Sequence, residues 1–328
     1  MRAVLPVAAG AGGDGVPRLG EVAEPVAGPG EVVLAVRATA INRADLLQVR
    51  GRYPPPQGES GVPGLEAAGE IVSVGSGVEG WRPGDRAAAL LAGGGHAQRV
   101  AVPAGQLLAL PRGWSVEEAA ALPEAALTAW TNLVVEGVLV AGQTVLISGA
   151  SGGVGIVAVQ LARELGAHVL VAGRDPERLE RLRELGAEGV FALADDLPSR
   201  VRAATGGRGV DLVLDLVGGA QLGRLLAALG ARGRLVLVGL VAGRRAELDL
   251  ELVLRQRLRL VGSVLRSRSR GEKAELVAGF LAFAAPLLAL RRLVPVVERS
   301  FEFGRIAEAY AHLEVGRPFG KVVVRIDD

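Results

Sequence analysis

Residues 144 to 155 read Thr-Val-Leu-Ile-Ser-Gly-Ala-Ser-Gly-Gly-Val-Gly. An apolar run typical of a buried strand passes directly into a glycine cluster, and an amphipathic helical pattern follows from Val154 to Leu165. Backbone N–H groups and a helix N-terminus can approach a pyrophosphate only where side chains are absent, so this order predicts a dinucleotide site. A glycine cluster alone could equally serve a tight turn. The predicted cofactor contacts are Ala150, Ser151, Gly152, Gly153, Val154 and Gly155.

Strand and helix patterns alternate on the C-terminal side of this stretch. Strand patterns occur at 168–172, 190–193, 211–215, 234–238 and 258–265, and helical patterns lie at 177–185 and 221–228. Alternation at this interval is typical of βαβ units, which form a parallel, doubly wound sheet. The fold class predicted for this region is therefore α/β, of the Rossmann type.

The first 120 residues have a different texture, with short strand patterns separated by glycine and proline turns such as Pro63-Gly64 and Pro83-Gly84. The last part of the chain, after an apolar helical pattern, resumes this strand-rich texture. We therefore expect a β-rich domain formed by residues 1–123 and 268–328, and a dinucleotide-binding domain at 124–267.

Composition narrows the classes of function. The 328 residues are 50% hydrophobic with a net charge of +2, and no cysteine is present. The cluster Arg266, Arg268 and Arg270 has no interleaved aromatic residues, so nucleic-acid binding is not expected. The longest apolar run, Leu276–Leu290, is shorter than the roughly 20 residues that span a bilayer. Because Met1–Val7 also lacks the pattern of a signal peptide, a cytoplasmic protein without membrane association is expected.

The end of the second strand of the dinucleotide unit bears on the choice of coenzyme. An NAD-preferring site would hold an acidic residue there for the ribose diol, but Gly173 is followed by Arg174, and Arg178 comes four residues later. Two guanidinium groups could bind a 2′-phosphate, which favours NADPH. Two alternatives stay open: both arginines could be solvated, and Asp175 could contact a 2′-hydroxyl.

Several motifs resemble one family over essentially the whole chain. They are Asn42-Arg43-Ala44-Asp45, Tyr53-Pro54-Pro55-Pro56, Gly64-Leu65-Glu66-Ala67-Ala68-Gly69, Gly93-Gly94-Gly95-His96-Ala97-Gln98, Leu265-Arg266-Ser267-Arg268 and Gly320-Lys321-Val322-Val323. Together they resemble the zinc-independent quinone oxidoreductases of the medium-chain dehydrogenase/reductase superfamily, related to zeta-crystallin, and within them the inducible subgroup linked to redox stress.

The resemblance implies a GroES-like catalytic domain, a Rossmann domain and NADPH as cofactor. It places Asn42 near the nicotinamide ribose and Thr128 at the carboxamide or phosphate side. The backbone of Val238-Gly239-Leu240, the side chain of Lys321 and the motif residue Leu265 are also implied cofactor contacts. Tyr53 resembles a pocket tyrosine whose hydroxyl holds an acceptor oxygen, although its ring could instead simply pack on the prolines that follow.

Metal catalysis is not expected. Zinc-containing relatives have a histidine where this chain has Leu65, cysteine is absent, and His96, His168 and His312 lie in unrelated segments. We expect these histidines to have surface or packing roles. The titratable residues nearest the motifs, Glu66 and Asp45, are expected to be structural.

Hydride transfer then depends on positioning and on polarisation of an acceptor oxygen. The expected function is reduction of quinones or similar conjugated carbonyl compounds such as enones with NADPH. One alternative is an enoyl-thioester reductase, because polyketide enoyl reductases share this framework. A second is a non-catalytic NADPH-binding protein. A homodimer is expected because the apolar strand pattern 258–265 would otherwise leave an exposed sheet edge.

Overall fold

The computed structural model describes residues 1–6, 14–194, 196–316 and 318–327. The described chain divides into two compact units. Unit 1 contains Met1–Leu127 and Arg266–Asp328, and unit 2 contains Thr128–Leu265. Each unit has its own sheet and its own apolar core.

Unit 2 is built on a six-stranded parallel sheet in the order β10-β9-β8-β11-β12-β13. Its strands are β8 (Thr144–Ser148), β9 (His168–Gly173), β10 (Gly189–Ala192), β11 (Val210–Asp215), β12 (Leu229–Leu237) and β13 (Arg259–Gly262). The sequence order reverses between the neighbours β8 and β11. This confirms the doubly wound parallel sheet, with its switch point at the carboxyl end of β8.

Helices cover the strands of unit 2. They are α4 (Gly153–Glu164), α5 (Pro176–Glu180), α6 (Leu197–Ala204), α7 (Leu222–Ala227) and α8 (Leu250–Gln256), and a π-helical turn covers Thr131–Val135. Helices α4 and α5 pack on β8 to β10, whereas α7 packs on β11 and β12. The expected helix 177–185 is divided, because α5 ends at Glu180 and a 3-10 turn follows at Arg181–Arg183.

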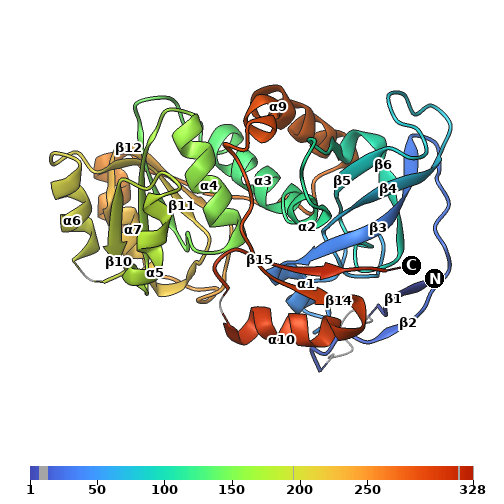
Figure 1. The fold of residues 1–328 in the computed structure, drawn as a ribbon. Helices are drawn as coiled ribbons and strands as arrows, with labels where there is room; N and C mark the ends of the chain where they lie inside the picture. The colour runs from blue at the N-terminus through green and yellow to red at the C-terminus, as the bar shows by residue number, and fades with distance from the viewer. Residues whose placement is uncertain (7–13, 195, 317, 328) are drawn as a thin grey trace. The chain divides into compact units, whose positions relative to one another are not determined.

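Unit 1 contains a largely antiparallel sheet in the order β14-β15-β3-β4-β5-β7, with β6 also paired to β3. Its strands are β3 (Glu31–Ile41), β4 (Glu66–Val74), β5 (Arg86–Leu90), β6 (Arg99–Pro103), β7 (Leu107–Ala109), β14 (Val297–Glu302) and β15 (Lys321–Arg325). A separate antiparallel pair is formed by β1 (Arg2–Val4) and β2 (Leu19–Glu21). The pairing of β15 with β3 brings the end of the chain beside its first long strand (Figure 1).

The helices of unit 1 are α1 (Arg43–Gln48), α2 (Val116–Ala120), α9 (Arg270–Ala289) and α10 (Ile306–Gly316), and α3 (Pro123–Trp130) begins in it. Helix α9 opens with a capping box in which the Ser269 hydroxyl accepts the N–H of Glu272 and the Glu272 side chain accepts the N–H of Ser269. Short 3-10 turns of unit 1 lie at Ala104–Gln106 and Phe303–Arg305, and another lies in unit 2 at Gly219–Gln221.

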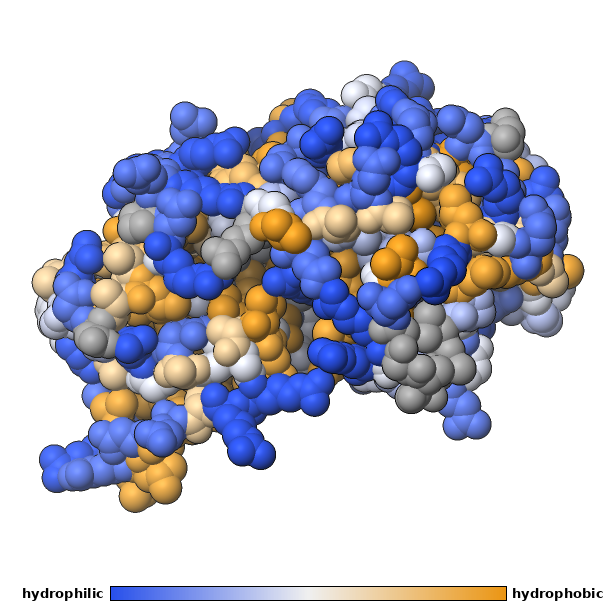
Figure 2. Space-filling view, turned by 90° about the horizontal axis from the view of Figure 1, so that it is seen from below, coloured by the Kyte–Doolittle hydropathy of each residue, from blue (hydrophilic) through white to orange (hydrophobic). Residues whose placement is uncertain are grey.

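On the face shown in Figure 2, hydrophilic side chains predominate and apolar residues form patches between them. In unit 2 the described residues with exposed large apolar side chains include Leu240, Leu250, Leu254, Leu260 and Val264. Two of these, Leu260 and Val264, lie in or next to β13, which is an edge strand of its sheet.

Candidate functional site

The glycine turn of unit 2 has the strand before it and the helix after it that the sequence predicts. Gly149 follows β8 with a φ of +78°, a conformation that favours glycine, and Gly152 is the N-cap of α4. Among the residues that the structure describes, no side chain caps this helix N-terminus. A Cβ atom on Gly155 would lie 2.4 Å from the Cα of Ala150, so only glycine lets the helix begin this close to the turn. The first N–H groups of α4 are thus suited to hold an anion.

The other predicted contacts of unit 2 follow the carboxyl ends of neighbouring strands. Gly173 ends β9, and Val238-Gly239-Leu240 follows β12. The loop after β11 is held by the buried Asp215, whose carboxylate accepts the N–H groups of Val217 and Gly218 at 3.0 and 3.1 Å. Parallel strands bring their carboxyl ends to one edge of the sheet, which is where α/β sheets bind ligands.

The basic residues after β9 are placed differently from one another. Arg174 is exposed, whereas Arg178 is half-buried and its Nε has no hydrogen-bond partner among the described residues. Asp175 is the N-cap of α5, and its Oδ1 accepts the N–H of Arg178 at 3.0 Å. One oxygen of the Asp175 carboxylate is therefore engaged by the protein. An unpaired, partly buried guanidinium nitrogen fits a phosphate group.

Two further predicted residues of unit 2 are buried. Thr128 lies on α3, where its carbonyl oxygen accepts a hydrogen bond from the Asn132 side chain at 2.7 Å. Leu265 is 6% exposed.

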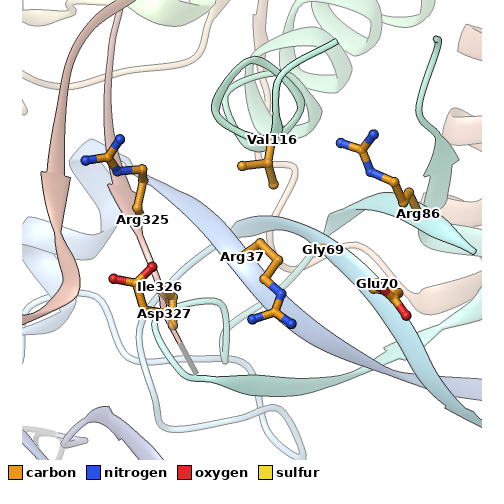
Figure 3. Close-up of a pocket in the computed structure, with 8 residues that line it drawn as sticks. All are labelled: Arg37, Gly69, Glu70, Arg86, Val116, Arg325, Ile326 and Asp327. Carbon is orange, nitrogen blue, oxygen red and sulfur yellow. The ribbon is translucent and has the colours of Figure 1, made fainter. Parts of the chain in front are cut away.

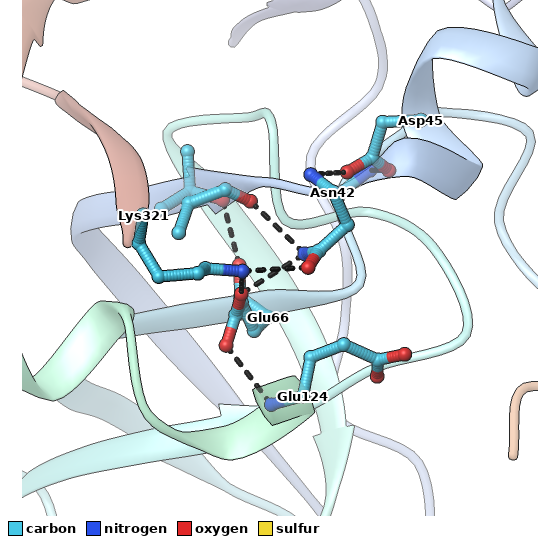
Figure 4. Close-up of polar contacts among 8 residues, drawn as sticks. Asn42, Asp45, Glu66, Glu124 and Lys321 are labelled. Atoms are coloured by element: carbon cyan, nitrogen blue, oxygen red, sulfur yellow. Dashed lines mark hydrogen bonds and ion pairs between the residues drawn. The ribbon is translucent and has the colours of Figure 1, made fainter. Parts of the chain in front are cut away.

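In unit 1, the sheet and the start of α1 bring the buried side chains of Glu66 and Lys321 together with the half-buried Asn42 in a polar network (Figure 4). The Nζ of Lys321 lies 2.6 Å from Glu66 Oε1 and 2.6 Å from Asn42 Oδ1. The Asn42 amide donates to the same carboxylate at 2.9 Å. Each member thus finds its partner inside the network, as buried charges require.

Asp45 holds the backbone beside this network. Its carboxylate accepts the N–H of Asn42 at 2.7 Å and the N–H of Gly64 at 3.0 Å. Asp45 therefore fixes the start of α1 against the segment that leads into β4.

Glu124, in the first turn of α3, approaches the network with its backbone only. Its N–H donates to Glu66 Oε2 at 2.9 Å, while its side chain extends away from the pair formed by Glu66 and Lys321 (Figure 4). Burial, together with the negative charge of Glu66, raises the pKa of the Glu124 carboxyl to about 8. This carboxyl holds its proton at neutral pH.

Tyr53 is held by Arg266, a buried arginine that the structure places in unit 1. The guanidinium carbon of Arg266 lies 5.1 Å from the centre of the Tyr53 ring, and its Nη1 donates to the Tyr53 carbonyl at 3.2 Å. Arg266 also donates to Gln48 Oε1 at 2.5 Å and to the Ala92 carbonyl at 2.8 Å. The Tyr53 ring is therefore fixed against a cation, and burial raises the pKa of its hydroxyl.

Lys273 of α9 is a second buried lysine of unit 1. Burial lowers the pKa of its ammonium group, while the negative charge of Glu59, and that of Glu124 once it is ionised, act in the opposite direction. The chain has only two lysines, Lys273 and Lys321, and both are buried.

The sequence prediction did not include Glu124, Arg266 or Lys273 as site residues. Lysine is scarce in a chain with 37 lysine and arginine residues, and that scarcity is a signal that could have drawn attention to Lys273. Glu124 stands at the start of an otherwise apolar helical segment, and that isolation is a comparable signal.

The histidines do not form a common site in the structure. His96 is fully buried, and its Nδ1 lies 2.9 Å from the Tyr310 hydroxyl. Burial lowers the pKa of its imidazole. His168 and His312 pair with the surface carboxylates Glu188 and Glu298. Among the described residues, no group of three or more His, Cys, Asp or Glu side chains is arranged to hold a metal ion.

A hollow of about 450 Å³ in unit 1 does not coincide with the predicted site residues (Figure 3). It is lined by Arg37, Gly69, Glu70, Arg86, Val116, Arg325, Ile326 and Asp327. Arg325 is already paired with Glu302 and Glu117.

In the described part of the chain, none of the helices combines the length and the apolar character needed to cross a bilayer.

Comparison with known proteins relates both units to established families. Residues 28–112 match the alcohol dehydrogenase GroES-like domain, and residues 153–281 match the zinc-binding dehydrogenase family. These matches confirm the predicted fold class, a Rossmann sheet with a GroES-like domain.

Solved structures resemble the chain over nearly its full length. The quinone oxidoreductase of Thermus thermophilus, also solved as a complex with NADPH, is 38% identical with a TM-score of 0.80, and the match covers 94% of this chain and 96% of that one. A structure described as an NAD-dependent alcohol dehydrogenase is 30% identical with a TM-score of 0.85, and the match covers all of both chains.

Curated relatives include large polyketide synthases. Polyketide synthase GfsB of Streptomyces halstedii is 34% identical over 90% of this chain and 5% of its own length. A spectinabilin polyketide synthase protein of Streptomyces orinoci is 38% identical over 93% of this chain and 13% of its own. The chain spans about a tenth of the length of the curated relatives it matches.

The matching families, the identity to the solved structures and the two-unit fold together show that the chain belongs to the medium-chain dehydrogenase/reductase superfamily of oxidoreductases.

Proposed function

We propose that the protein transfers hydride from NADPH to quinones or similar conjugated carbonyl compounds. The observation that carries the proposal is the carboxyl edge of the unit 2 sheet, where the uncapped start of α4 and the unpaired Nε of Arg178 both suit the phosphates of NADPH. Bound NADPH supplies the hydride. The likeness to the Thermus quinone oxidoreductase over 94% of the chain supports the acceptor class.

The residues of unit 2 have binding roles in this proposal. Residues 150 to 155 hold the pyrophosphate, and Arg174 with Arg178 holds the 2′-phosphate beyond Gly173. Thr128, Leu265 and the backbone of residues 238–240 position the nicotinamide half.

The residues of unit 1 orient the reactants. Asn42 and Lys321 contact the cofactor, and the network with Glu66 fixes their side chains. The Tyr53 hydroxyl holds and polarises an acceptor oxygen, because Arg266 keeps the ring in place. None of these roles requires a side chain to form a covalent intermediate.

The test is an NADPH oxidation screen against quinones, enones and enoyl thioesters, with NADH run in parallel. We expect steady turnover with quinones or enones. Stoichiometric NADPH binding without turnover of any acceptor would contradict the proposal and favour a non-catalytic binding protein.

A second candidate, an enoyl-thioester reductase, is favoured by the likeness to the polyketide synthases of Streptomyces, which extends over 90% or more of this chain. Faster turnover of an enoyl thioester than of any quinone in the same screen would establish this candidate instead.

Replacement of Arg174 with alanine is expected to weaken the binding of NADPH by roughly tenfold or more, because each charge-assisted hydrogen bond to a phosphate contributes about 1.5 to 3 kcal/mol. NADH lacks the 2′-phosphate and should be nearly unaffected. The measurement is kcat/KM for both coenzymes, and the loss should lie in KM because the contact is remote from the reacting atoms. Equal losses with both coenzymes, or a wild type that prefers NADH, would contradict the assignment and favour Asp175 as the ribose ligand.

We also propose a homodimer that covers the edge strand β13. Leu260 and Val264 are 48% and 52% exposed at this edge, and an open apolar strand invites pairing with a second copy. Sedimentation velocity at micromolar concentration should show a dimer for the wild type. Leu260→Glu should give a monomer, because it places a charge in the contact. A monomeric wild type would contradict this proposal.

A further inference from the structure

One carboxyl group of unit 1 has no role in the proposed function so far. The side chain of Glu124 extends away from the ion pair of Glu66 and Lys321, as Figure 4 shows. Lys321 is therefore paired with Glu66 and not with Glu124. Among the described residues, no hydrogen bond or ion pair is formed by the carboxyl oxygens of Glu124. The backbone N–H of Glu124 is fixed on Glu66 Oε2, which holds the start of α3 in place.

The groups that act electrostatically on Glu124 come from six segments of unit 1. They are Asp45 of α1, Tyr53 of the loop after α1, Glu66 of β4, Arg266, Lys273 of α9 and Lys321 of β15. Two of them, Tyr53 and Arg266, contact each other, and Tyr53 is the proposed acceptor ligand. The ionisation of Glu124 is therefore coupled electrostatically to the residues proposed to hold the acceptor.

We propose that Glu124 donates the proton that accompanies reduction of the acceptor. This inference rests on the proposed function. A quinone that has gained a hydride carries one negative charge and needs one proton to become the neutral hydroquinone. The O–H bond of the Glu124 carboxyl breaks, a new O–H bond forms on the acceptor, and the Glu124 carboxylate takes a proton back from water.

The charges around Glu124 favour both the protonated acid before the transfer and the carboxylate that is left after it. Burial and the charge of Glu66 keep the carboxyl protonated up to a pKa of about 8, so the acid form is present at neutral pH. The ammonium groups of Lys321 and Lys273 favour the carboxylate that remains after the proton has left. A donor whose pKa lies near the working pH is the most effective kind of general acid.

The test compares wild type, Glu124→Gln and Glu79→Gln in single turnovers, in which the loss of NADPH absorbance is followed after mixing with excess quinone. The amide introduced by Glu124→Gln keeps the shape and neutrality of the protonated acid but cannot give up a proton. Glu79 is an exposed residue of the same unit and controls for the change of residue type. With a quinone whose hydroquinone is weakly acidic, Glu124→Gln should lower the rate by roughly 10²-fold, and Glu79→Gln should leave it unchanged.

A quinone with strongly electron-withdrawing substituents, such as tetrachloro-1,4-benzoquinone, provides a second control. Its hydroquinone is acidic enough to remain an anion at neutral pH, so no proton donor is needed. Glu124→Gln should therefore reduce this quinone at nearly the wild-type rate. A similar loss with both quinones would overturn the inference, because it would show a general defect in binding or folding.

The pH profile gives an independent readout. The wild-type rate with the weakly acidic hydroquinone should fall as pH rises through about 8, and Glu124→Gln should lack this decline. Tyr53→Phe should keep it, because the Tyr53 hydroxyl has a pKa raised above its usual value. A decline that survives in Glu124→Gln would overturn the inference.

A measurement without turnover tests the acid itself. The native carboxyl keeps its proton up to about pH 8, whereas the unfolded chain releases it near 4.5. The folded state thus binds the extra proton in this window, and the free energy of unfolding should fall as pH rises through it. Infrared difference spectra should show a protonated carboxyl band that is absent in Glu124→Gln. The absence of that band from the wild type would overturn the inference.

These outcomes separate the inference from the proposed function. A wild type that reduces quinones while Glu124→Gln matches it in every assay would overturn the inference alone. A wild type that reduces neither quinones nor enones would overturn both.

Discussion

Replacement of Lys321 with methionine is expected to lower the free energy of unfolding by about 3–5 kcal/mol, because it leaves the Glu66 carboxylate buried without its countercharge. Methionine fills a similar volume, so a cavity contributes little to the loss. The measurement is chemical denaturation of wild type and variant followed by circular dichroism.

A double variant isolates the charge. Lys321→Met with Glu66→Gln removes both charges, while the amide oxygen introduced by Glu66→Gln can still accept the N–H of Glu124. We expect it to recover about 2 kcal/mol or more of the loss. Arg305→Met breaks an exposed pair with Glu308, which solvent screens, and should change the stability far less than Lys321→Met does. A cost as small for Lys321→Met would mean that water reaches the pair in solution.

The dinucleotide unit could be predicted from the sequence because its signals are local. The strand before Gly149 and the helix that begins at Gly153 follow from hydrophobic periodicity and from the glycine turn within about 20 residues of chain. The sheet order then follows from the chain's alternation of strand and helix.

The predicted limits of strands and helices differ from those in the structure where tertiary packing decides where an element begins or ends. The sequence pattern of residues 96–102 predicts a strand, but β6 begins only at Arg99, because the preceding glycines pack tightly against another segment. A Cβ atom on Gly95 would lie 2.7 Å from the carbonyl oxygen of Glu66, so this segment forms a close turn rather than a strand. The expected strand 258–265 is limited to Arg259–Gly262, where its partner β12 ends at Leu237.

The contacts among the acidic and basic residues of unit 1 could not be predicted, because the partners are distant in the chain. Glu66 and Lys321 are 255 positions apart, and Arg266 reaches Gln48 across 218. Asn42, Tyr53 and Lys321 were found through motif resemblance, which carries over only positions that the motifs contain. The charge on Glu124 depends on burial and on Glu66, and neither can be inferred from neighbouring residues.

Replacement of Gly155 with alanine is expected to weaken the binding of NADPH by roughly a hundredfold or more. It should lower the free energy of unfolding by about 1–3 kcal/mol. The added Cβ would lie within 2.6 Å of the Cα, C and O atoms of Ala150, and backbone cannot rotate away as a side chain can. The turn must move, and its N–H groups then lose their alignment with the pyrophosphate.

Gly230→Ala is the matched control for this change. Its Cβ would lie 2.6 Å from the Arg208 carbonyl oxygen, again a backbone atom, but Gly230 is near the amino end of β12, away from the proposed cofactor edge. It should cost comparable stability and leave the Kd for NADPH unchanged, as measured by fluorescence titration of the folded protein. If both variants weaken the binding of NADPH to the same extent, the loss reflects general destabilisation of unit 2. That result would contradict the assignment of the glycine turn as the pyrophosphate site.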